Sequence, residues 1–294
     1  MIYSVNVHKK QENEWMIDLS TGTKNVAAIH DLSGYGRCSL GAVMPILSVM
    51  GLHCCSLPTA VLSNHTGYSD FTFLDFTPHL PDFINHWQKL GLQFDTIYSG
   101  FLGGEDQIDI VIDFIKRFRR PGALVAVDPV MGDNGELYPS FTDSLCSHMK
   151  RLVGHADIVF PNLTEAMLLT GNRTPFDRIE KSDIPAIARA ISETGPQKVI
   201  ITGAVHGDIV TNYVFDFMNN IHFEISEGYN HKSYSGTGDI FASIVCGGLT
   251  LGRDLKQSVT AAARFIEKAA RYTDSVSADT REGILFEHFL KELA

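Results

Sequence analysis

Short β-rich runs alternate with helix-like segments along most of the chain, and this alternation constrains its fold more than any other feature. The segments 107–118 and 184–195 have the apolar periodicity of helices, the second with Gly195 as its expected C-cap. The apolar runs, most of which end in Gly, Asp, Asn or Pro, lie at residues 26–29, 95–100, 123–129, 157–162 and 198–203. Nearly continuous apolar strands separated by helices predict an α/β fold, with a mostly parallel sheet covered by helices on both faces.

The later part of the chain adds two elements to this prediction. Residues 207–226 read as an antiparallel hairpin that turns at Asn219 and Asn220, and residues 258–273 read as an amphipathic helix. We expect a single domain over residues 25–294 and a loosely attached extension over residues 1–24. Ligands of parallel sheets bind outside the carboxyl ends of the strands, so polar residues at those ends are the candidate site.

Composition excludes several classes of partner. The chain has 294 residues and a formal net charge of -10, so most of its surface repels nucleic acid and anionic membranes. Its five cysteines show neither CxxC nor zinc spacing, which fits a reducing compartment. The charged N-terminal region does not resemble a signal peptide, and no apolar run is long enough to span a bilayer. We therefore expect a cytoplasmic protein with a small-molecule ligand.

The stretch "SYSGTGDIFASIVCGGL" at residues 233–249 predicts an anion site at a helix start. Gly236, Thr237 and Gly238 can aim several backbone N–H groups at one point, and the helix dipole adds positive potential there. Asp239 has two interpretations. It is either an N-cap residue or a general base that takes the proton of an alcohol attacking a phosphoryl group held by those N–H groups.

Other strand ends supply oxygen ligands. Asp128 ends one run, in "VDPVMGDNGELY", and Asn162 follows another, with Glu165 one helical turn later. Carboxylates of this kind suit Mg²⁺, although Asp128 can equally serve turn chemistry and "NLTE" a capping box. Beside an anion site they favour Mg-nucleotide chemistry. The chain has no GxxxxGK[ST] and no HRD or DFG motif, so it is neither a P-loop enzyme nor a protein kinase.

Three motifs in family order carry a resemblance to known proteins. "AVLSNHTGY", "DPVMGDNGELY" and "GTGDIFAS" resemble the pyridoxal kinases, a vitamin-kinase subgroup of the ribokinase-like superfamily, from about Val26 to the C-terminal helix. The resemblance implies a three-layer sandwich without a separate lid domain. It also implies transfer of phosphate from MgATP to the 5′-hydroxymethyl group of pyridoxal, pyridoxamine or pyridoxine, by a homodimer often helped by a monovalent cation.

The same resemblance implies roles for individual residues. Asp239 matches the catalytic base, and Gly236, Thr237 and Gly238 match the anion hole. The loop from Gly132 to Tyr138 matches a flap over the site. Expected substrate contacts are Asp31, Ser33, Thr66, Phe101 and Tyr138. Expected ATP contacts are Asp128, Asn162, Glu165, Thr202 and Gly203, of which Asp128 and Glu165 also face the metal.

The first glycine-rich segment departs from the pyridoxal kinase pattern. Many of those kinases carry a serine at the end of the first strand that touches the pyridine ring, whereas this chain reads "IHDLSGYGRCSLG", so Asp31 or Ser33 takes that role. The Asp31 carboxylate can accept a hydrogen bond from the protonated ring nitrogen or the 3-hydroxyl of the substrate, or it can cap the following turn. The pattern leans towards the hydroxymethylpyrimidine (phosphate) kinases of thiamine synthesis, which are the alternative. Phe160 replaces a hydroxyl residue of relatives near the monovalent-cation position.

Overall fold

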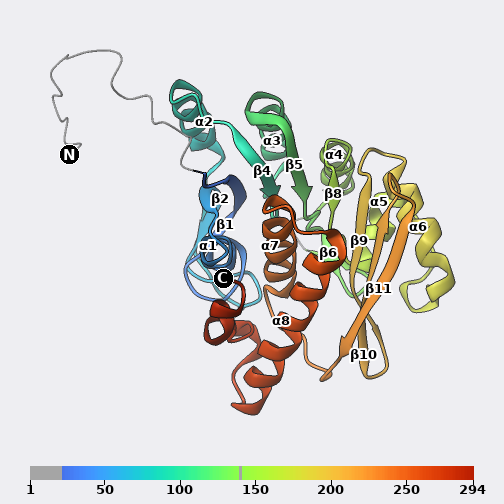
Figure 1. Ribbon diagram of the computed structural model, residues 1–294. Coiled ribbons are helices and arrows are strands. Elements are labelled where there is room, and N and C mark those ends of the chain that lie inside the picture. Colours follow the sequence, from blue (N-terminus) through green and yellow to red (C-terminus); the bar gives the residue numbers. More distant parts are fainter. Residues whose placement is uncertain (1–21, 139–140) are drawn as a thin grey trace, which may run out of the picture.

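A nine-stranded sheet with helices on both faces forms the protein (Figure 1). The computed structural model describes residues 22–138 and 141–294, so nearly all of the expected N-terminal extension lies outside the described residues. The strands follow the order β11-β10-β9-β8-β5-β4-β1-β2-β3. Their bounds are β1 (Asn25–Ser33), β2 (His53–Leu62), β3 (Phe73–Asp75), β4 (Phe94–Ser99), β5 (Arg119–Val127), β8 (Ile158–Val159), β9 (Lys198–His206), β10 (Ile209–Asp216) and β11 (Ile221–Gly228).

The six strands from β9 across to β2 are parallel, whereas β10 pairs antiparallel with β9 at one side and β3 pairs antiparallel with β2 at the other. A separate two-stranded hairpin consists of β6 (Gly132–Asp133) and β7 (Glu136–Leu137). The helices are α1 (Ser39–Val49), α2 (Leu80–Lys89), α3 (Glu105–Phe118), α4 (Asp143–Val153), α5 (Leu163–Thr170), α6 (Ile184–Ser192), α7 (Thr237–Thr250) and α8 (Leu255–Ser275). None of the described helices combines the length and apolar character needed to traverse a bilayer.

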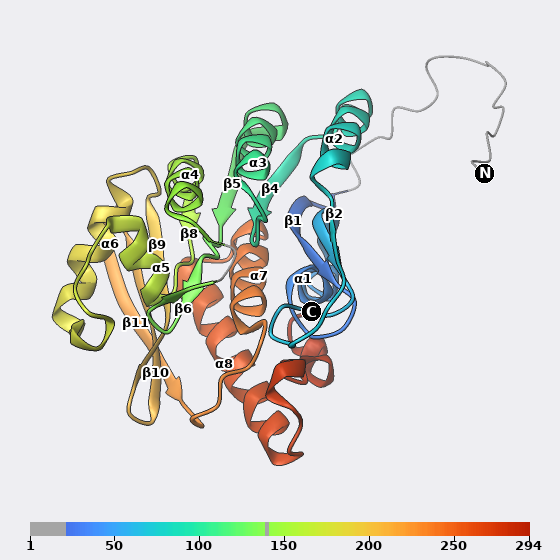
Figure 2. The same cartoon turned by 180° about the vertical axis from the view of Figure 1, so that it is seen from behind.

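The helices form two outer layers around the sheet. Helices α1, α7 and α8 cover one face, and α2 to α6 cover the other (Figures 1 and 2). Strand β1 shows why the strands read as continuous apolar runs. Val26 and Ala28 join the core under α7, whereas Ala27 and Ile29 join the core under α3. The expected three-layer α/β architecture is confirmed.

Strand β1 lies at the point where the order of the sheet reverses. The chain runs from β1 to its neighbour β2 and later returns to β4 on the other side of β1. The ends of β1 and β4 therefore diverge into loops on opposite sides, which leaves a crevice position at the carboxyl edge. His30 and Asp31 lie there, where the β1–β2 register shifts between His30 and Leu32.

Several predicted boundaries are wrong, each for a local reason. Gly195 is not a C-cap, because α6 ends earlier with Glu193 in that position. Strand β9 does not end at Gly203 but continues to His206, since it pairs with β10 as an antiparallel hairpin. The hairpin of β10 and β11 turns before Ile221, as expected. Strand β2 is absent from the predicted set, because Pro58 and polar residues obscure its pattern.

Candidate active site

The first turn of α7 forms the centre of the site. Gly236 is the N-cap and has a φ of 78°, and a Cβ there would lie 2.0 Å from the Arg37 carbonyl oxygen, so only glycine fits. Asp239 is the third residue of the helix. The N-cap interpretation of Asp239 is therefore wrong, and its carboxylate is available for another role.

The Asp239 carboxylate lies in a recess between three elements. Its side chain is 15% exposed, its Oδ2 accepts a hydrogen bond from the Ser39 backbone N–H at 2.8 Å, and its Oδ1 lies 3.7 Å from His30 Nδ1. Burial is the main cause that raises the pKa of Asp239 to about 7; the Ser39 hydrogen bond opposes the rise and the charge of Asp31 adds to it. A carboxylate with a pKa near neutrality is suited to general-base catalysis.

Asp31 joins the end of β1 to the start of α1. Its Oδ1 accepts from the Ser39 hydroxyl at 2.5 Å and its Oδ2 from the Ser33 hydroxyl at 3.0 Å. Burial raises the pKa of Asp31, and these hydroxyls oppose the rise. The Ser33 hydroxyl, a predicted ring contact, donates its hydrogen bond to Asp31. Each Asp31 oxygen keeps a lone pair for a further donor.

Ser39 is a site residue that the sequence motifs do not reveal. It has a φ of 48°, an uncommon backbone conformation for a serine, and opens α1. This conformation lets one residue donate its N–H to Asp239 and its hydroxyl to Asp31. A serine at the start of the helix after "DLSGYGRC" is the only signal in the sequence, and it is indistinguishable from an ordinary helix start. Strained residues of this kind often mark functional sites.

The loop after β2 brings Thr66 to the same rim. Gly67 donates its N–H to His65 Nδ1 at 3.1 Å, and His65 Nε2 lies 2.6 Å from the Arg281 carbonyl oxygen. A Cβ at Gly67 would lie 3.9 Å from the Ser235 hydroxyl, just before the anion hole. Thr66 is exposed, and the next residue, Gly67, approaches the segment that leads into α7; a substrate contact by Thr66 stays a prediction.

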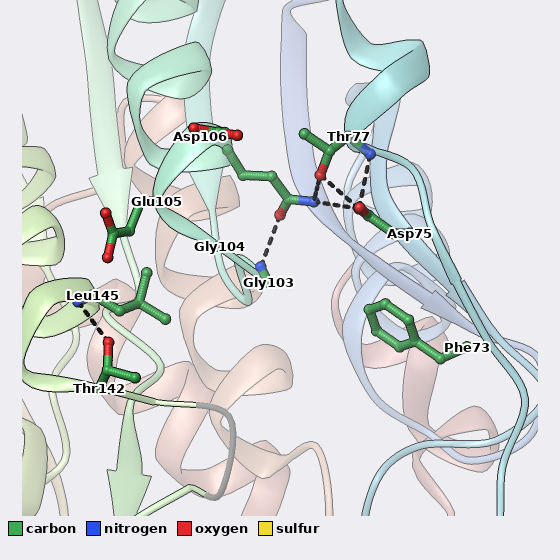
Figure 3. A pocket seen from close by; sticks show the side chains of 10 residues that line it. Phe73, Asp75, Thr77, Gly103, Gly104, Glu105, Asp106, Thr142 and Leu145 are labelled. Atoms are coloured by element: carbon green, nitrogen blue, oxygen red, sulfur yellow. Dashed lines mark hydrogen bonds between the residues drawn. The ribbon is translucent and has the colours of Figure 1, made fainter.

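The loop after β4 carries Phe101, which packs partly buried against the core under α3. The Thr59 hydroxyl donates to the Phe101 carbonyl at 3.0 Å. Gln107, 1% exposed, donates to the Thr59 carbonyl and the Thr77 hydroxyl and accepts from the Gly103 N–H. These bonds hold the loop beside a cavity of about 540 Å³ at the start of α3 (Figure 3). None of the predicted site residues lines that cavity, so this cavity is not the predicted site.

Asp128 and Glu165 lie on the other side of the anion hole. Asp128 follows β5 and is 8% exposed, and a Cβ at Gly238 would lie 3.8 Å from its Oδ2. None of the described residues donates a hydrogen bond to its carboxylate. Glu165 Oε1 accepts from Met131 N–H at 3.1 Å, and its Oε2 accepts from Asn162 N–H at 2.8 Å. Burial raises the pKa of both carboxyls, and their mutual repulsion raises that of Asp128 further.

"NLTE" forms a capping box, which was the local alternative for this motif. The Asn162 side chain accepts from the Glu165 N–H at 2.9 Å while Glu165 returns a bond to the Asn162 N–H. Asn162 also donates from Nδ2 to the Gly132 carbonyl at 2.8 Å, and the Thr164 hydroxyl accepts from the Gly135 N–H at 2.8 Å. The capping box therefore also docks the predicted flap against α5.

Tyr138 closes the flap segment. Its N–H donates to the Met131 carbonyl at 3.0 Å, and its side chain is 41% exposed.

Thr202, predicted to touch the nucleotide, pairs with Asn162 in an isolated bridge. Gly203 has a φ of 68° and donates its N–H to the Asn212 side chain at 3.1 Å. The prediction that Gly203 ends a strand is wrong, because β9 continues to His206. The bridge nevertheless places Thr202 beside Asn162.

The donor chemistry around Asp128 fits a hydrated Mg²⁺. Residues 22–138 and 141–294 contain no group of three or more His, Cys, Asp or Glu side chains that could hold a metal ion by themselves. Magnesium in nucleotide sites needs only one or two carboxylates, because phosphate and water supply the remaining oxygens. The Asp128 carboxylate, which has no hydrogen-bond donor among the described residues, has lone pairs available for that purpose.

Comparisons with known proteins agree with this fold. The family described as phosphomethylpyrimidine kinase matches residues 44–283. A Bacteroides thetaiotaomicron protein assigned as a phosphomethylpyrimidine kinase, crystallised with pyridoxal, is 44% identical, with a TM-score of 0.88 over 92% of this chain and 96% of that one. Pyridoxal kinase from Lactobacillus plantarum is 28% identical, with a TM-score of 0.84 over 92% and 96%. A Deinococcus radiodurans pyridoxal kinase is 29% identical over 63% of this chain, and the matched region spans 64% of that kinase.

The fold and these similarities place the protein in the class of ribokinase-like small-molecule kinases. More narrowly, the chain belongs to the phosphomethylpyrimidine kinase family. The resemblance to the vitamin kinases is thereby confirmed.

Proposed function

We propose that this protein is a pyridoxal kinase, which transfers the γ-phosphoryl group of ATP to the 5′-hydroxymethyl group of pyridoxal, pyridoxamine or pyridoxine. The observation that carries the proposal is the Asp239 carboxylate, placed in the first turn of α7 and held with a pKa of about 7 beside three backbone N–H groups. The similarity to a protein crystallised with pyridoxal supports the substrate class.

In the proposed reaction, Asp239 accepts the proton of the 5′-hydroxyl as its oxygen attacks the γ-phosphorus. The bond from that phosphorus to the β,γ-bridging oxygen breaks, and ADP leaves. The backbone N–H groups of Gly236, Thr237 and Gly238 stabilise the charge on the phosphoryl oxygens. Their position at the N-terminus of a 14-residue helix adds its dipole to this effect.

Mg²⁺ supplies charge neutralisation for the phosphates when bound. We propose Asp128 as its direct ligand, because no described residue donates to that carboxylate. Glu165 would act through water, since each of its oxygens already accepts from a backbone N–H. Asn162, Thr202 and Gly203 would contact the nucleotide.

For the vitamer we propose that Asp31 binds the polar edge of the pyridine ring, with Ser33 holding the carboxylate in place. Thr66, Phe101 and Tyr138 would complete the pocket, and the flap ending at Tyr138 would exclude water. A homodimer, a cytoplasmic location and dependence on a monovalent cation stay predictions from the resemblance. The Phe160 side chain packs in the core against Phe241 and, unlike a hydroxyl side chain, has no oxygen to offer such a cation.

The test is ATP-dependent phosphorylation of pyridoxal, pyridoxamine and hydroxymethylpyrimidine, measured side by side with Asp239→Asn as the control. We expect turnover of a pyridoxine-type substrate that falls by about 10²–10⁴-fold in the variant. Turnover of the pyrimidine alone would contradict the proposal and favour the alternative that the family description and "DLSGYG" suggest. Unchanged turnover in the variant would contradict the role of Asp239.

A further inference from the structure

His30 lies directly behind the catalytic carboxylate and has no part in the mechanism above. It is fully buried on β1, and its Nδ1 lies 3.7 Å from Asp239 Oδ1. Neither ring nitrogen has a hydrogen-bond partner among the described residues. Buried polar groups in folded proteins are nearly always paired, so a buried imidazole without any other partner, next to a carboxylate, requires an explanation.

The surroundings of His30 hold its ring in this direction. The ring meets Tyr98 edge-on, with 4.3 Å between ring centroids. On another side, a Cβ at Gly100 would lie 2.2 Å from His30 Nδ1, so the absence of a side chain there makes room for the imidazole. The Gly100 N–H is itself fixed on the Ile29 carbonyl at 3.0 Å. The imidazole is therefore packed in place, with Nδ1 towards Asp239.

The chemistry of the pair determines which nitrogen carries the proton. A neutral imidazole has one N–H donor and one lone-pair acceptor. Asp239 must be ionised to act as a base, and a lone pair on His30 Nδ1 would repel that carboxylate. A proton on Nδ1 instead makes the contact attractive, and the 3.7 Å separation needs to close by only about 0.5 Å to reach hydrogen-bonding length.

We propose that His30 is a positioning residue for the phosphoryl-transfer reaction, a neutral imidazole whose Nδ1–H holds Oδ1 of Asp239 while the Ser39 N–H holds Oδ2. This inference rests on the proposed role of Asp239. Two donors from different elements, β1 and the start of α1, then fix the rotation of the carboxylate about its side-chain bonds. Each oxygen keeps a lone pair that can accept the proton of the substrate hydroxyl, so the carboxylate is oriented and both oxygens stay available to the substrate.

A role as proton acceptor fits the site less well. Burial lowers the pKa of His30 to about 3, whereas that of Asp239 is about 7. A proton taken from the substrate therefore stays on Asp239 by a factor of about 10⁴. His30 orients the base and does not relay its proton.

The remaining ring nitrogen, Nε2, has no hydrogen-bond partner among the described residues. Three hydroxyls share with His30 the absence of a partner among the described residues, namely those of Tyr98, Ser99 and Ser243. Tyr98 and Ser99 lie on β4, which pairs with β1, and Ser243 follows Asp239 by one turn of α7. With Nδ1 as the donor, Nε2 is an acceptor, and a hydroxyl is the kind of group that would pair with it.

The test compares His30→Leu, which removes both nitrogens, with His30→Asn, whose amide nitrogen can replace Nδ1–H. Turnover is measured with whichever alcohol the wild type phosphorylates. We expect His30→Leu to lower kcat on the order of 10²-fold, with the Kd for ADP and the KM for the alcohol nearly unchanged, and His30→Asn to restore most of it. Thr96→Val is the matched control. Thr96 lies on β4, the strand next to β1, and its buried hydroxyl is hydrogen-bonded to that of Thr250 at the end of α7, so its loss should lower stability but not kcat.

A double-mutant cycle separates positioning from general damage. In the Asp239→Asn background, His30→Leu should cause no further loss of kcat, because the base that it orients is gone. Unchanged kcat in the single variant, or an equal loss in both backgrounds, would overturn the proposal.

A measurement on the wild type keeps the inference testable if the variants fold poorly. The ¹⁵N spectrum of histidine-labelled protein, with the His30 signal among the twelve histidines assigned by its loss in His30→Asn, should show a neutral ring with the proton on Nδ1 at pH 7. An Nε2–H tautomer or an imidazolium would refute it. If the wild type phosphorylates none of the alcohols, the proposed function fails while this spectrum still decides the state of His30.

Discussion

Replacing Asp239, the proposed catalytic base, should make the protein more stable in a pH-dependent way. Burial raises the pKa of Asp239 from 3.8 to about 7. Because the folded-state pKa lies above the unfolded one, the protonated group favours folding at low pH, and that contribution is lost as the pH rises through 7. Asp239→Asn keeps the shape and polarity of the side chain but removes the buried charge.

The magnitude follows from the size of the pKa difference. About three pH units correspond to about 4 kcal/mol of unfolding free energy at pH 8, an upper bound because the side chain is 15% exposed. At pH 5 only the interval from pH 3.8 to pH 5 contributes, so the destabilisation caused by Asp239 is about 1.5 kcal/mol there. The advantage of Asp239→Asn over the wild type should therefore grow by about 2.5 kcal/mol from pH 5 to pH 8.

The assay is denaturant or thermal unfolding of both proteins at pH 5, 6.5 and 8 without nucleotide. His30 titrates in the opposite sense, because burial lowers its pKa to about 3 and the protein loses stability as the pH falls below 6.5. That contribution is common to both proteins and cancels in the difference. A difference that does not change with pH, or a variant less stable than the wild type at pH 8, would refute the assignment of a buried carboxyl whose pKa is raised.

Three further predictions test other parts of the site. The kcat/KM of the wild type for its alcohol should rise with pH and level off above about pH 7, because Asp239 must be ionised in the free enzyme; a flat profile between pH 5.5 and 8 would contradict this. Asp128→Asn should raise the Mg²⁺ concentration needed for half-maximal rate several-fold while the protein stays folded, and an unchanged Mg²⁺ titration would exclude Asp128 as the ligand. Gly236→Ala should lower the unfolding free energy by about 1–3 kcal/mol and abolish turnover, because Gly236 has a φ of 78° and a Cβ there would collide with the Arg37 carbonyl oxygen. Calorimetry and a rate assay check this prediction. Retained activity would show that the anion hole tolerates a shift.

The site depends on contacts between segments that are far apart in the chain. Asp239, Ser39 and His30 come from α7, α1 and β1, and no spacing in the sequence relates them. The motif identified Asp239 because a glycine-rich turn before an apolar helix is a local pattern. His30 gives no such pattern, since a single histidine at a strand end is compatible with many roles.

The sequence by itself determined the α/β class and the parallel strands, and it predicted where the anion hole and the base lie. These features follow from local periodicity, glycine content and the residue types at strand ends, which a one-dimensional pattern records. Only the tertiary structure decided that Ser33 supports Asp31, that Gly203 lies within a longer strand and that Asp239 has two oriented neighbours. The physical reason is that hydrogen-bond partners and the desolvation that shifts a pKa arise from packing between distant segments, which sequence order does not encode.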